Sequence, residues 1–161
     1  MRTAVLAAAI ALLALPVWAE PVARPAIAAV APGTGDAGTT PMSNDEVFKA
    51  FHGRPGIDRI VDELLRRNQA DPRVADIFKG PDLIHLRAQL ADYFCYVLGG
   101  PCTYGGKDMR TAHKDMGLQD ADLNALIENL QAAMDKEGVP FRAQNKLLAK
   151  LAPMRKLVVV R

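Results

Sequence analysis

Apolar residues recur at helical spacing over most of the chain after residue 44. The clearest case lies between residues 57 and 65, where apolar side chains fall at i, i+3, i+4, i+7 and i+8 and so share one face (Ile57, Ile60, Val61, Leu64 and Leu65). Similar stripes begin near Asp82, at Asp120 and after Gly138. No segment shows a convincing strand-like alternation of apolar and polar residues. The pattern predicts an all-α protein.

Turn and capping residues predict where these helices begin and end. Ser43-Asn44-Asp45-Glu46 fits a capping box, which would start a short helix running from Asn44 to about Phe51. Asp71-Pro72 should open a helical turn that leads to Phe78. Gly99-Gly100-Pro101 should end the helix that starts near Asp82, and Pro153 should break the last one. A further short segment, from about Asp108 to Asp115, carries His113.

The N-terminal residues follow a different pattern. Residues 1–19 contain an early Arg2, an apolar run and a small residue before Glu20, which is typical of a cleaved secretory signal. An uncleaved anchor is the alternative, but the run is shorter than the roughly 20 residues of a spanning helix and Pro16 interrupts it. Residues 20–43 are rich in Pro, Ala, Gly and Thr and predict a disordered linker. We expect one domain over residues 44–161, a periplasmic or secreted location and no membrane span after cleavage.

Composition and charge exclude several function classes. The chain has 161 residues and a formal net charge of +2, and no run of Lys and Arg stands out. This argues against a nucleic-acid partner. No glycine-rich loop ends in Gly-Lys-Ser/Thr, so phosphate-loop nucleotide binding has no support.

Two cysteines lie seven positions apart, on either side of the Gly-Gly-Pro turn. Cys95 and Cys102 could form a disulfide in an oxidising compartment if the chain turns between them. Two unpaired thiols, one of them buried in a helix, remain the alternative. Their spacing to histidines does not fit a zinc site.

Candidate chemistry is concentrated around the glycine-rich loop. His113 follows this loop, and a neutral imidazole is a good iron ligand when a porphyrin supplies the other nitrogens. Phe78 would offer a flat apolar face, and four leucines could line the far side (Leu64, Leu65, Leu86 and Leu90). Taken singly, His113 could be a surface residue, and Phe78 and the leucines could be ordinary core residues.

Together these segments make the chain recognisable. Residues from about Asp45 to Arg161 resemble the truncated globins, most closely group 1. The resemblance is carried by Gly56-Ile57, Ile60-Val61-Asp62, Asp71-Pro72-Arg73-Val74, Ile77-Phe78, Phe94-Cys95, Leu98-Gly99-Gly100-Pro101, Tyr104, Gly106, Met109, His113 and Met116-Gly117.

The resemblance implies a two-over-two helical sandwich around haem b. By this resemblance, Phe78 matches the phenylalanine that stacks on the ring, and His113 matches the proximal iron ligand. The remaining residues expected in the haem pocket are Leu65, Leu86, Leu90, Tyr104, Met109 and Met116. Lys107, Arg110 and Lys114 are candidates to meet the haem propionates, unless they are simply solvated.

The distal positions depart from the family pattern. Leu65 stands where many members have a tyrosine, and Leu86 and Leu90 stand where members often carry at least one glutamine. A hydrogen-bond donor beside bound dioxygen contributes roughly 1–3 kcal/mol. The apolar pocket therefore argues against tight dioxygen storage, while carbon monoxide and nitric oxide depend less on a donor.

Three other side chains of the same segment could still supply a polar group. Tyr93 could point inward, Gln89 or His85 could swing over the haem, and His85 could even bind iron as a sixth ligand. For His85, a position facing solvent is the alternative.

We expect a haem protein that reversibly binds dioxygen or another diatomic gas, with a possible redox partner. The first alternative is a haem enzyme acting on nitric oxide or peroxide, which would need a general acid or base near the iron. The second is a helical binding module without cofactor.

Overall fold

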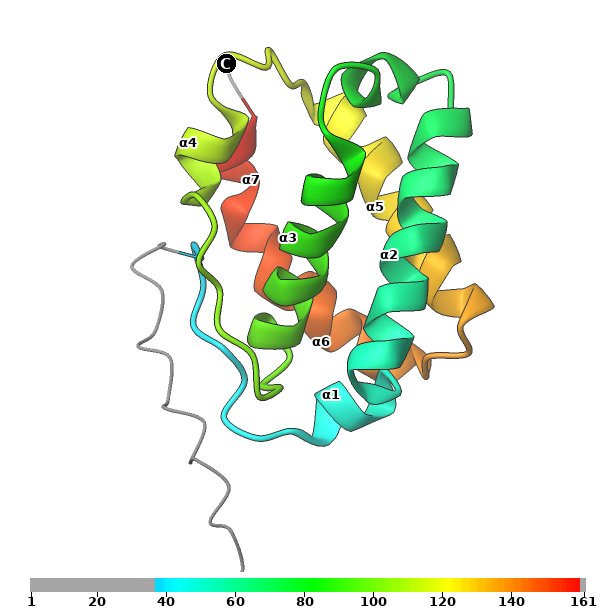
Figure 1. Ribbon diagram of the computed structural model, residues 1–161, viewed down its shortest axis with the longest axis vertical. Helices are drawn as coiled ribbons and strands as arrows, with labels where there is room; N and C mark the ends of the chain where they lie inside the picture. Colours follow the sequence, from blue (N-terminus) through cyan, green and yellow to red (C-terminus); the bar gives the residue numbers. More distant parts are fainter. Residues whose placement is uncertain (1–36, 160–161) are drawn as a thin grey trace, which may run out of the picture.

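The computed structural model describes residues 37–159, in which the regular elements are helices joined by turns and loops (Figure 1). The predicted signal peptide, residues 20–36 and the last two residues lie outside this range. The elements are α1 Glu46–Ala50, α2 Gly53–Ala70, η1 Ala75–Phe78, α3 Leu83–Val97, α4 Met109–His113, α5 Asp120–Lys136, α6 Phe141–Leu151, η2 Ala152–Met154 and α7 Arg155–Val158. Residues 37–159 contain no β-strand. The all-α prediction is confirmed.

The long helices form two layers. In Figure 1, α2 and α3 lie nearer the viewer, and α5 and α6 lie behind them. Helix α2 packs against both α3 and α5, α5 packs against α6, and the short α4 packs against α7. This is the two-over-two arrangement expected from the sequence.

Helix α2 forms because its apolar residues share one stripe. All five residues of the predicted stripe are buried, none with more than 6% of its surface exposed (Ile57, Ile60, Val61, Leu64 and Leu65). Burying one such side chain is worth about 1.5–3 kcal/mol. The stripe therefore fixes which side of α2 faces α3 and α5.

Helix ends differ from the prediction in detail. Asp82 caps α3 as expected for a helix starting there, because its Oδ1 accepts from the amides of Ile84 and His85 at 3.0 and 3.1 Å. The capping box predicted at Ser43 is wrong. Instead, Asn44 Oδ1 accepts from the Glu46 amide and the helix begins two residues later than predicted. The short polar side chain of Asn44 closes this turn locally.

The N-cap of α5, in contrast, lies one residue earlier than predicted. Gln119, not Asp120, occupies it, and the Gln119 amide donates to Asp122 Oδ2 at 2.8 Å. The break predicted at Pro153 is confirmed, because α6 ends at Leu151 and a 3-10 turn (η2) leads into α7.

The ordered domain begins earlier than the sequence analysis placed it. Ala37 is 5% exposed, and its carbonyl oxygen accepts from the Tyr93 hydroxyl at 3.2 Å. The Met42 amide donates to the Val97 carbonyl at 3.0 Å, and Lys150 Nζ donates to the Thr40 carbonyl at 2.9 Å. Residues 37–43 are therefore a strap packed on the domain, and the prediction of disorder for them is wrong.

A disulfide ties the end of α3 to the loop that follows it. Cys95 and Cys102 are bonded, which decides between the two possibilities left open by the sequence. The turn between them depends on Gly99, which has φ +78° and whose added Cβ would lie 2.3 Å from the Asn44 carbonyl oxygen. A side chain at this position would be strained as well as obstructed.

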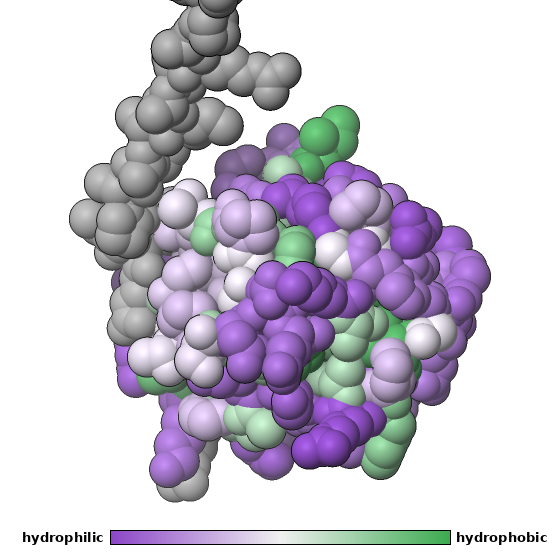
Figure 2. Space-filling model, turned by 90° about the horizontal axis from the view of Figure 1, so that it is seen from below, coloured by the Kyte–Doolittle hydropathy of each residue, from purple (hydrophilic) through white to green (hydrophobic). Residues whose placement is uncertain are grey.

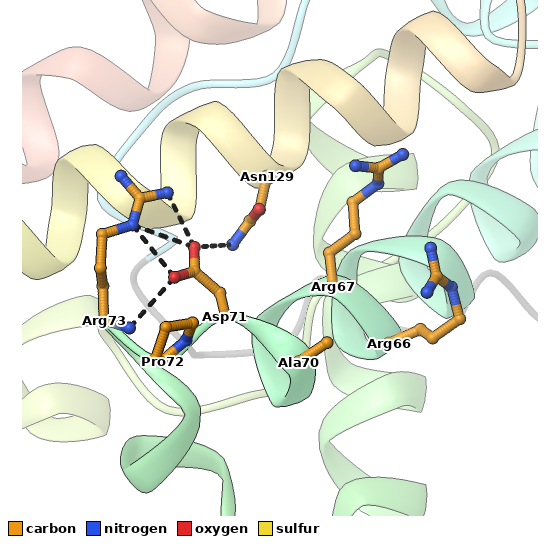
Figure 3. A pocket seen from close by; sticks show the side chains of 7 residues that line it. All are labelled: Arg66, Arg67, Ala70, Asp71, Pro72, Arg73 and Asn129. Carbon is orange, nitrogen blue, oxygen red and sulfur yellow. Dashed lines mark hydrogen bonds and ion pairs between the residues drawn. The ribbon is translucent and has the colours of Figure 1, made fainter.

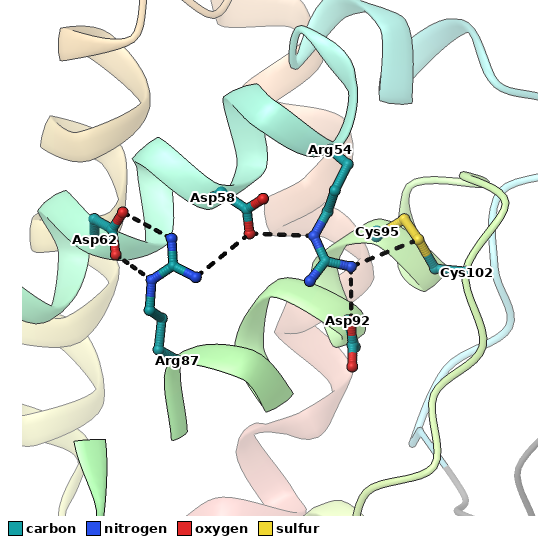
Figure 4. A network of polar contacts seen from close by, with 7 residues as sticks. All are labelled: Arg54, Asp58, Asp62, Arg87, Asp92, Cys95 and Cys102. Carbon is teal, nitrogen blue, oxygen red and sulfur yellow. Dashed lines mark hydrogen bonds and ion pairs between the residues drawn. A yellow bond between two sulfur atoms is a disulfide. The ribbon is translucent and has the colours of Figure 1, made fainter. Parts of the chain in front are cut away.

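Ion pairs beside the disulfide join α2 to α3 (Figure 4). Arg54 Nη1 donates to Asp92 Oδ1 at 2.7 Å, and Arg54 Nε donates to Asp58 at 3.1 Å. One turn further along, Arg87 of α3 binds Asp62 of α2, with Nη2 2.8 Å from Oδ2. These contacts fix the register of α3 against α2.

Glu63 is a buried acid that joins α2 to α5. Its carboxylate accepts from Arg66 at 2.6 and 2.9 Å and from Lys136 of α5 at 2.7 Å. Hydrogen bonds from Arg66, and then from Lys136, hold the pKa of Glu63 well below its usual value of 4.5. Because the folded pKa is depressed, this stabilisation is present above pH 4.5 and is lost as the pH falls through the folded pKa.

We therefore expect Glu63→Gln to lower the stability at pH 7 by about 1 kcal/mol, or roughly 4 °C in Tm. The difference from wild type should shrink as the pH is lowered below 4.5, where protonation weakens the same contacts. Thermal unfolding followed by circular dichroism at several pH values checks this. Glu46→Gln is the control, because Glu46 is exposed and makes no ion pair within residues 37–159. An equal Tm difference at all pH values would contradict the role of the charge.

Candidate functional site

His113 is held in a fixed orientation at the end of α4. Asp108 begins this helix by accepting from the Thr111 amide at 2.9 Å. His113 Nδ1 lies 2.8 Å from the Met109 carbonyl oxygen, and since a carbonyl only accepts, Nδ1–H is the donor. No other side-chain hydrogen bond or ion pair involves His113 among the described residues. The free Nε2 lone pair is therefore the one available to a metal.

This arrangement is the one that a metal-ligating histidine uses. Such a histidine usually donates its second ring N–H to a carboxylate or a backbone carbonyl, which fixes the tautomer and the ring orientation. Helix α4 is supported in turn by α7 and by the strap. A Cβ added at Gly38 would lie 3.2 Å from Met109 Cγ, so the strap passes close over the start of α4.

Six of the eight residues predicted for the haem pocket belong to one apolar cluster. Leu65 and Tyr104 are buried within it. Phe78, Leu86, Leu90 and Met109 are only partly buried and pack against it. These six residues come from α2, η1, α3, the following loop and α4, and the cluster is the main hydrophobic core of the domain, which also includes residues of α1, α5 and α6.

The other two predicted residues lie outside this cluster. His113 is half-buried, and Met116 is 41% exposed in the turn after α4. The contacts of all eight residues with haem stay predictions.

The residues present fit a haem group. Leu86 and Leu90 lie on α3, and Phe78 ends η1, yet all three keep part of their apolar surface uncovered. A flat apolar macrocycle would cover such surface, and its four nitrogens would complete the coordination of an iron held by His113 Nε2. No group of three or more His, Cys, Asp or Glu side chains suited to a metal ion occurs among residues 37–159.

Two candidate polar groups of α3 lie against other parts of the domain. The Tyr93 hydroxyl is buried and contacts the Ala37 carbonyl and Met154 Sδ, so it is directed toward the strap and η2. Burial raises the pKa of Tyr93, which keeps the hydroxyl protonated. The Gln89 amide oxygen lies against the loop at Gly106, where it would meet an added Cβ at 2.5 Å.

His85, the candidate sixth ligand, is exposed in the first turn of α3. Its side chain makes no hydrogen bond or ion pair within residues 37–159. The solvent-facing alternative therefore matches its position, and the leucines remain the side chains expected beside a bound gas.

The N-terminal strap is the part of this region that sequence reasoning missed. Ala37 and Gly38 pack near Met109 and Met154, although the segment looks like the rest of the Pro/Ala/Gly-rich linker. Small apolar residues at irregular spacing carry no periodic signal, so only their contacts reveal them.

Two surface pockets lie elsewhere. A pocket of about 360 Å³ at the end of α2 is lined by Arg66, Arg67, Ala70, Asp71, Pro72, Arg73 and Asn129 (Figure 3). Here Asp71 accepts from Arg73 and Asn129, which lowers the pKa of Asp71. A second pocket, of about 330 Å³, lies between α2 and the end of α5. None of the eight predicted haem residues lines either pocket.

None of the described helices has the length and hydropathy needed to cross a membrane.

The two-layer helical fold, the orientation of His113 and the partly exposed apolar side chains of Phe78, Leu86 and Leu90 are what a haem protein of the globin class needs. The model of the family described as bacterial-like globin matches residues 46–160. A group 1 truncated haemoglobin of Tetrahymena pyriformis is 34% identical over 68% of this chain and 91% of its own length. That of Nostoc commune is 29% identical over 68% and 92%.

Solved structures agree with this assignment. The truncated haemoglobin of Tetrahymena pyriformis in its Fe(III) form superposes with a TM-score of 0.69 at 32% identity, covering 71% of this chain and 98% of that one. A group II truncated haemoglobin of Bacillus anthracis, at 24% identity and a TM-score of 0.64, shares the fold. The chain belongs to the bacterial-like globin family and is a truncated haemoglobin. It binds haem b, and the haem iron binds a diatomic gas.

Proposed function

We propose that this globin is exported to the periplasm or the cell exterior and there carries or senses a diatomic gas that it releases readily. The observation that carries the proposal is the apolar character of the expected distal side. Leu65, Leu86 and Leu90 cannot donate a hydrogen bond, the Tyr93 hydroxyl contacts Ala37 and Met154, and the Gln89 amide oxygen lies near Gly106. The N-terminal signal pattern of residues 1–19 supports export.

The haem supplies the iron at which the gas binds. His113 would hold that iron from the proximal side through Nε2, while the Met109 carbonyl keeps the ring in the required tautomer. Phe78 and the leucines would exclude water from the ring face. Without a distal donor, dioxygen should dissociate quickly, whereas carbon monoxide and nitric oxide should be held nearly as well as in a polar pocket.

A redox partner is part of the proposal. Reversible binding of dioxygen or carbon monoxide requires ferrous iron, and a globin that loses dioxygen readily in an oxidising compartment needs a source of electrons. The chain itself offers none among its described residues, because both cysteines are in the disulfide.

The alternative, a haem enzyme acting on nitric oxide or peroxide, has less support. Such chemistry benefits from a general acid or base positioned at the iron. The side chains expected there are leucines, and His85 is exposed.

Gas binding by the mature protein tests the proposal. With haem loaded onto the chain from Glu20, we expect a stable carbon monoxide spectrum and rapid dioxygen loss in stopped-flow displacement. Peroxide consumption should not exceed that of free haem. Slow dioxygen loss would contradict the proposed release, and peroxide turnover well above free haem would favour the enzyme. Fractionation of cells expressing the full chain should place a product beginning at Glu20 outside the cytoplasm.

A further inference from the structure

Ion pairs neutralise the basic side chains of this protein unevenly. Every Lys and Arg between residues 45 and 100 has a carboxylate within 4.0 Å (Lys49, Arg54, Arg59, Arg66, Arg67, Arg73, Lys79 and Arg87). In this half of the domain the positive charges are therefore largely balanced by close acids.

The C-terminal helices are different. Between Gly138 and Val159 the chain has five basic residues and no Asp or Glu (Arg142, Lys146, Lys150, Arg155 and Lys156). Among the residues that the structure describes, only Arg155 has a carboxylate partner, Asp120 at 2.7 Å. Lys150 is bonded to neutral oxygens of Thr40. Arg142, Lys146 and Lys156 make no ion pair within the described residues. Within residues 37–159, the positive charge of this segment is therefore left without close acids.

Three of these side chains share one side of α6. Arg142, Lys146 and Lys150 follow each other at intervals of four residues, which places them along one side of α6. Helix α6 continues through η2 into α7, which carries Lys156. We call Arg142, Lys146 and Lys150 the basic surface. At its far end, α7 packs against α4, the helix of His113 (Figure 1).

We propose that the basic surface is the docking site for a small acidic electron-transfer protein that reduces the haem iron. This inference rests on the proposed function, since it names the chemistry of the redox partner. One electron passes from the reduced partner to ferric iron, which becomes ferrous; the partner is oxidised by one electron, and no bond forms or breaks. Opposite charge on the partner would speed the encounter and orient it.

An acidic protein fits this surface better than a lipid bilayer does. The apolar side of α6 is used inside the domain, where Ala143 and Leu147 are buried. Phe141 is the one large apolar side chain of α6 that is strongly exposed, at 70%. Seen from below, the end of the molecule where α6 begins is mainly hydrophilic with small apolar patches (Figure 2). A helix lying in a membrane interface needs a broad apolar face outward.

The test is the rate at which a reduced acidic flavoprotein, flavodoxin, reduces the ferric haem-loaded protein. Stopped-flow absorption under anaerobic conditions gives the second-order rate constant. For the wild type we expect it to fall about tenfold or more between roughly 10 and 200 mM salt. Lys146→Glu should lower the low-salt rate by about three- to tenfold.

Lys49→Glu is the matched control. It makes the same change in net charge on α1, at a side chain that is 71% exposed and paired with Asp45. We expect its rate to stay within about twofold of wild type. Dithionite, a small reductant that needs no docking surface, should reduce all three proteins at the same rate.

Two results would overturn the docking proposal while leaving the globin intact. Equal losses of rate in Lys146→Glu and Lys49→Glu would show that only net charge matters. A salt-independent flavodoxin rate, together with Lys146-dependent binding to phosphatidylglycerol vesicles, would assign the surface to a membrane. Failure of the wild type to take up haem would instead overturn the proposed function and this inference with it, and the Soret band reports that separately.

Discussion

Replacing His113 by alanine should lower the haem affinity of this protein by about 100-fold or more. Loss of even a supporting partner of a metal ligand typically costs 10–100-fold, and His113 is the expected ligand itself. The fixed ring leaves Nε2 as the free donor, with Nδ1 bonded to the Met109 carbonyl at 2.8 Å. Titration of the apoprotein with haem, followed at the Soret band, measures the affinity.

His85→Ala is the control for this experiment. His85 is exposed in the first turn of α3, so its removal should change neither the affinity nor the spectrum of the reduced protein. Imidazole added to His113→Ala should restore part of the five-coordinate spectrum, because it supplies the missing nitrogen. An unchanged Soret titration in His113→Ala would refute the ligand assignment, and a changed reduced spectrum in His85→Ala would identify His85 as a sixth ligand.

The second large effect is expected on the distal side. Leu90→Gln or Leu86→Gln would place an amide donor where the protein has only apolar side chains. One such hydrogen bond contributes roughly 1–3 kcal/mol, so the dissociation of dioxygen should slow by about five- to 150-fold. Carbon monoxide dissociation should change little. Displacement of dioxygen by carbon monoxide in stopped flow measures the first rate.

Methionine variants separate the donor from the change of shape. Leu90→Met and Leu86→Met are close in volume to leucine, and such swaps usually cost less than about 1.5 kcal/mol. Both positions are only partly buried, which favours tolerance of the amide as well. If glutamine and methionine alter dioxygen dissociation equally, the change comes from the shape of the new side chain and not from a donated hydrogen bond, and the argument from Leu65, Leu86 and Leu90 fails.

Much of the fold could be predicted from local pattern. The apolar stripe of α2 and the break at Pro153 could be predicted because helical periodicity and the effect of proline on a helix depend only on residues close in sequence. The helix ends were less accurate, as Ser43 and Gln119 illustrate, since several polar residues compete for one cap. His113 was identified by its place after a glycine-rich loop and by resemblance. The bond that orients its ring depends on the backbone of α4.

The sequence by itself determined the helical class, the apolar face of each long helix, the truncated-globin pattern and the histidine at its centre. These are properties of spacing and residue type, which are already present in the unfolded chain. Only the tertiary structure decided that Cys95 bonds Cys102, that residues 37–43 pack as a strap, and that Tyr93 is directed toward Ala37. It also decided which charges are neutralised, because Arg142, Lys146 and Lys156 have no ion pair within residues 37–159, which the net charge of +2 does not reveal. Such pairings join residues far apart in the chain, and only packing brings them within reach.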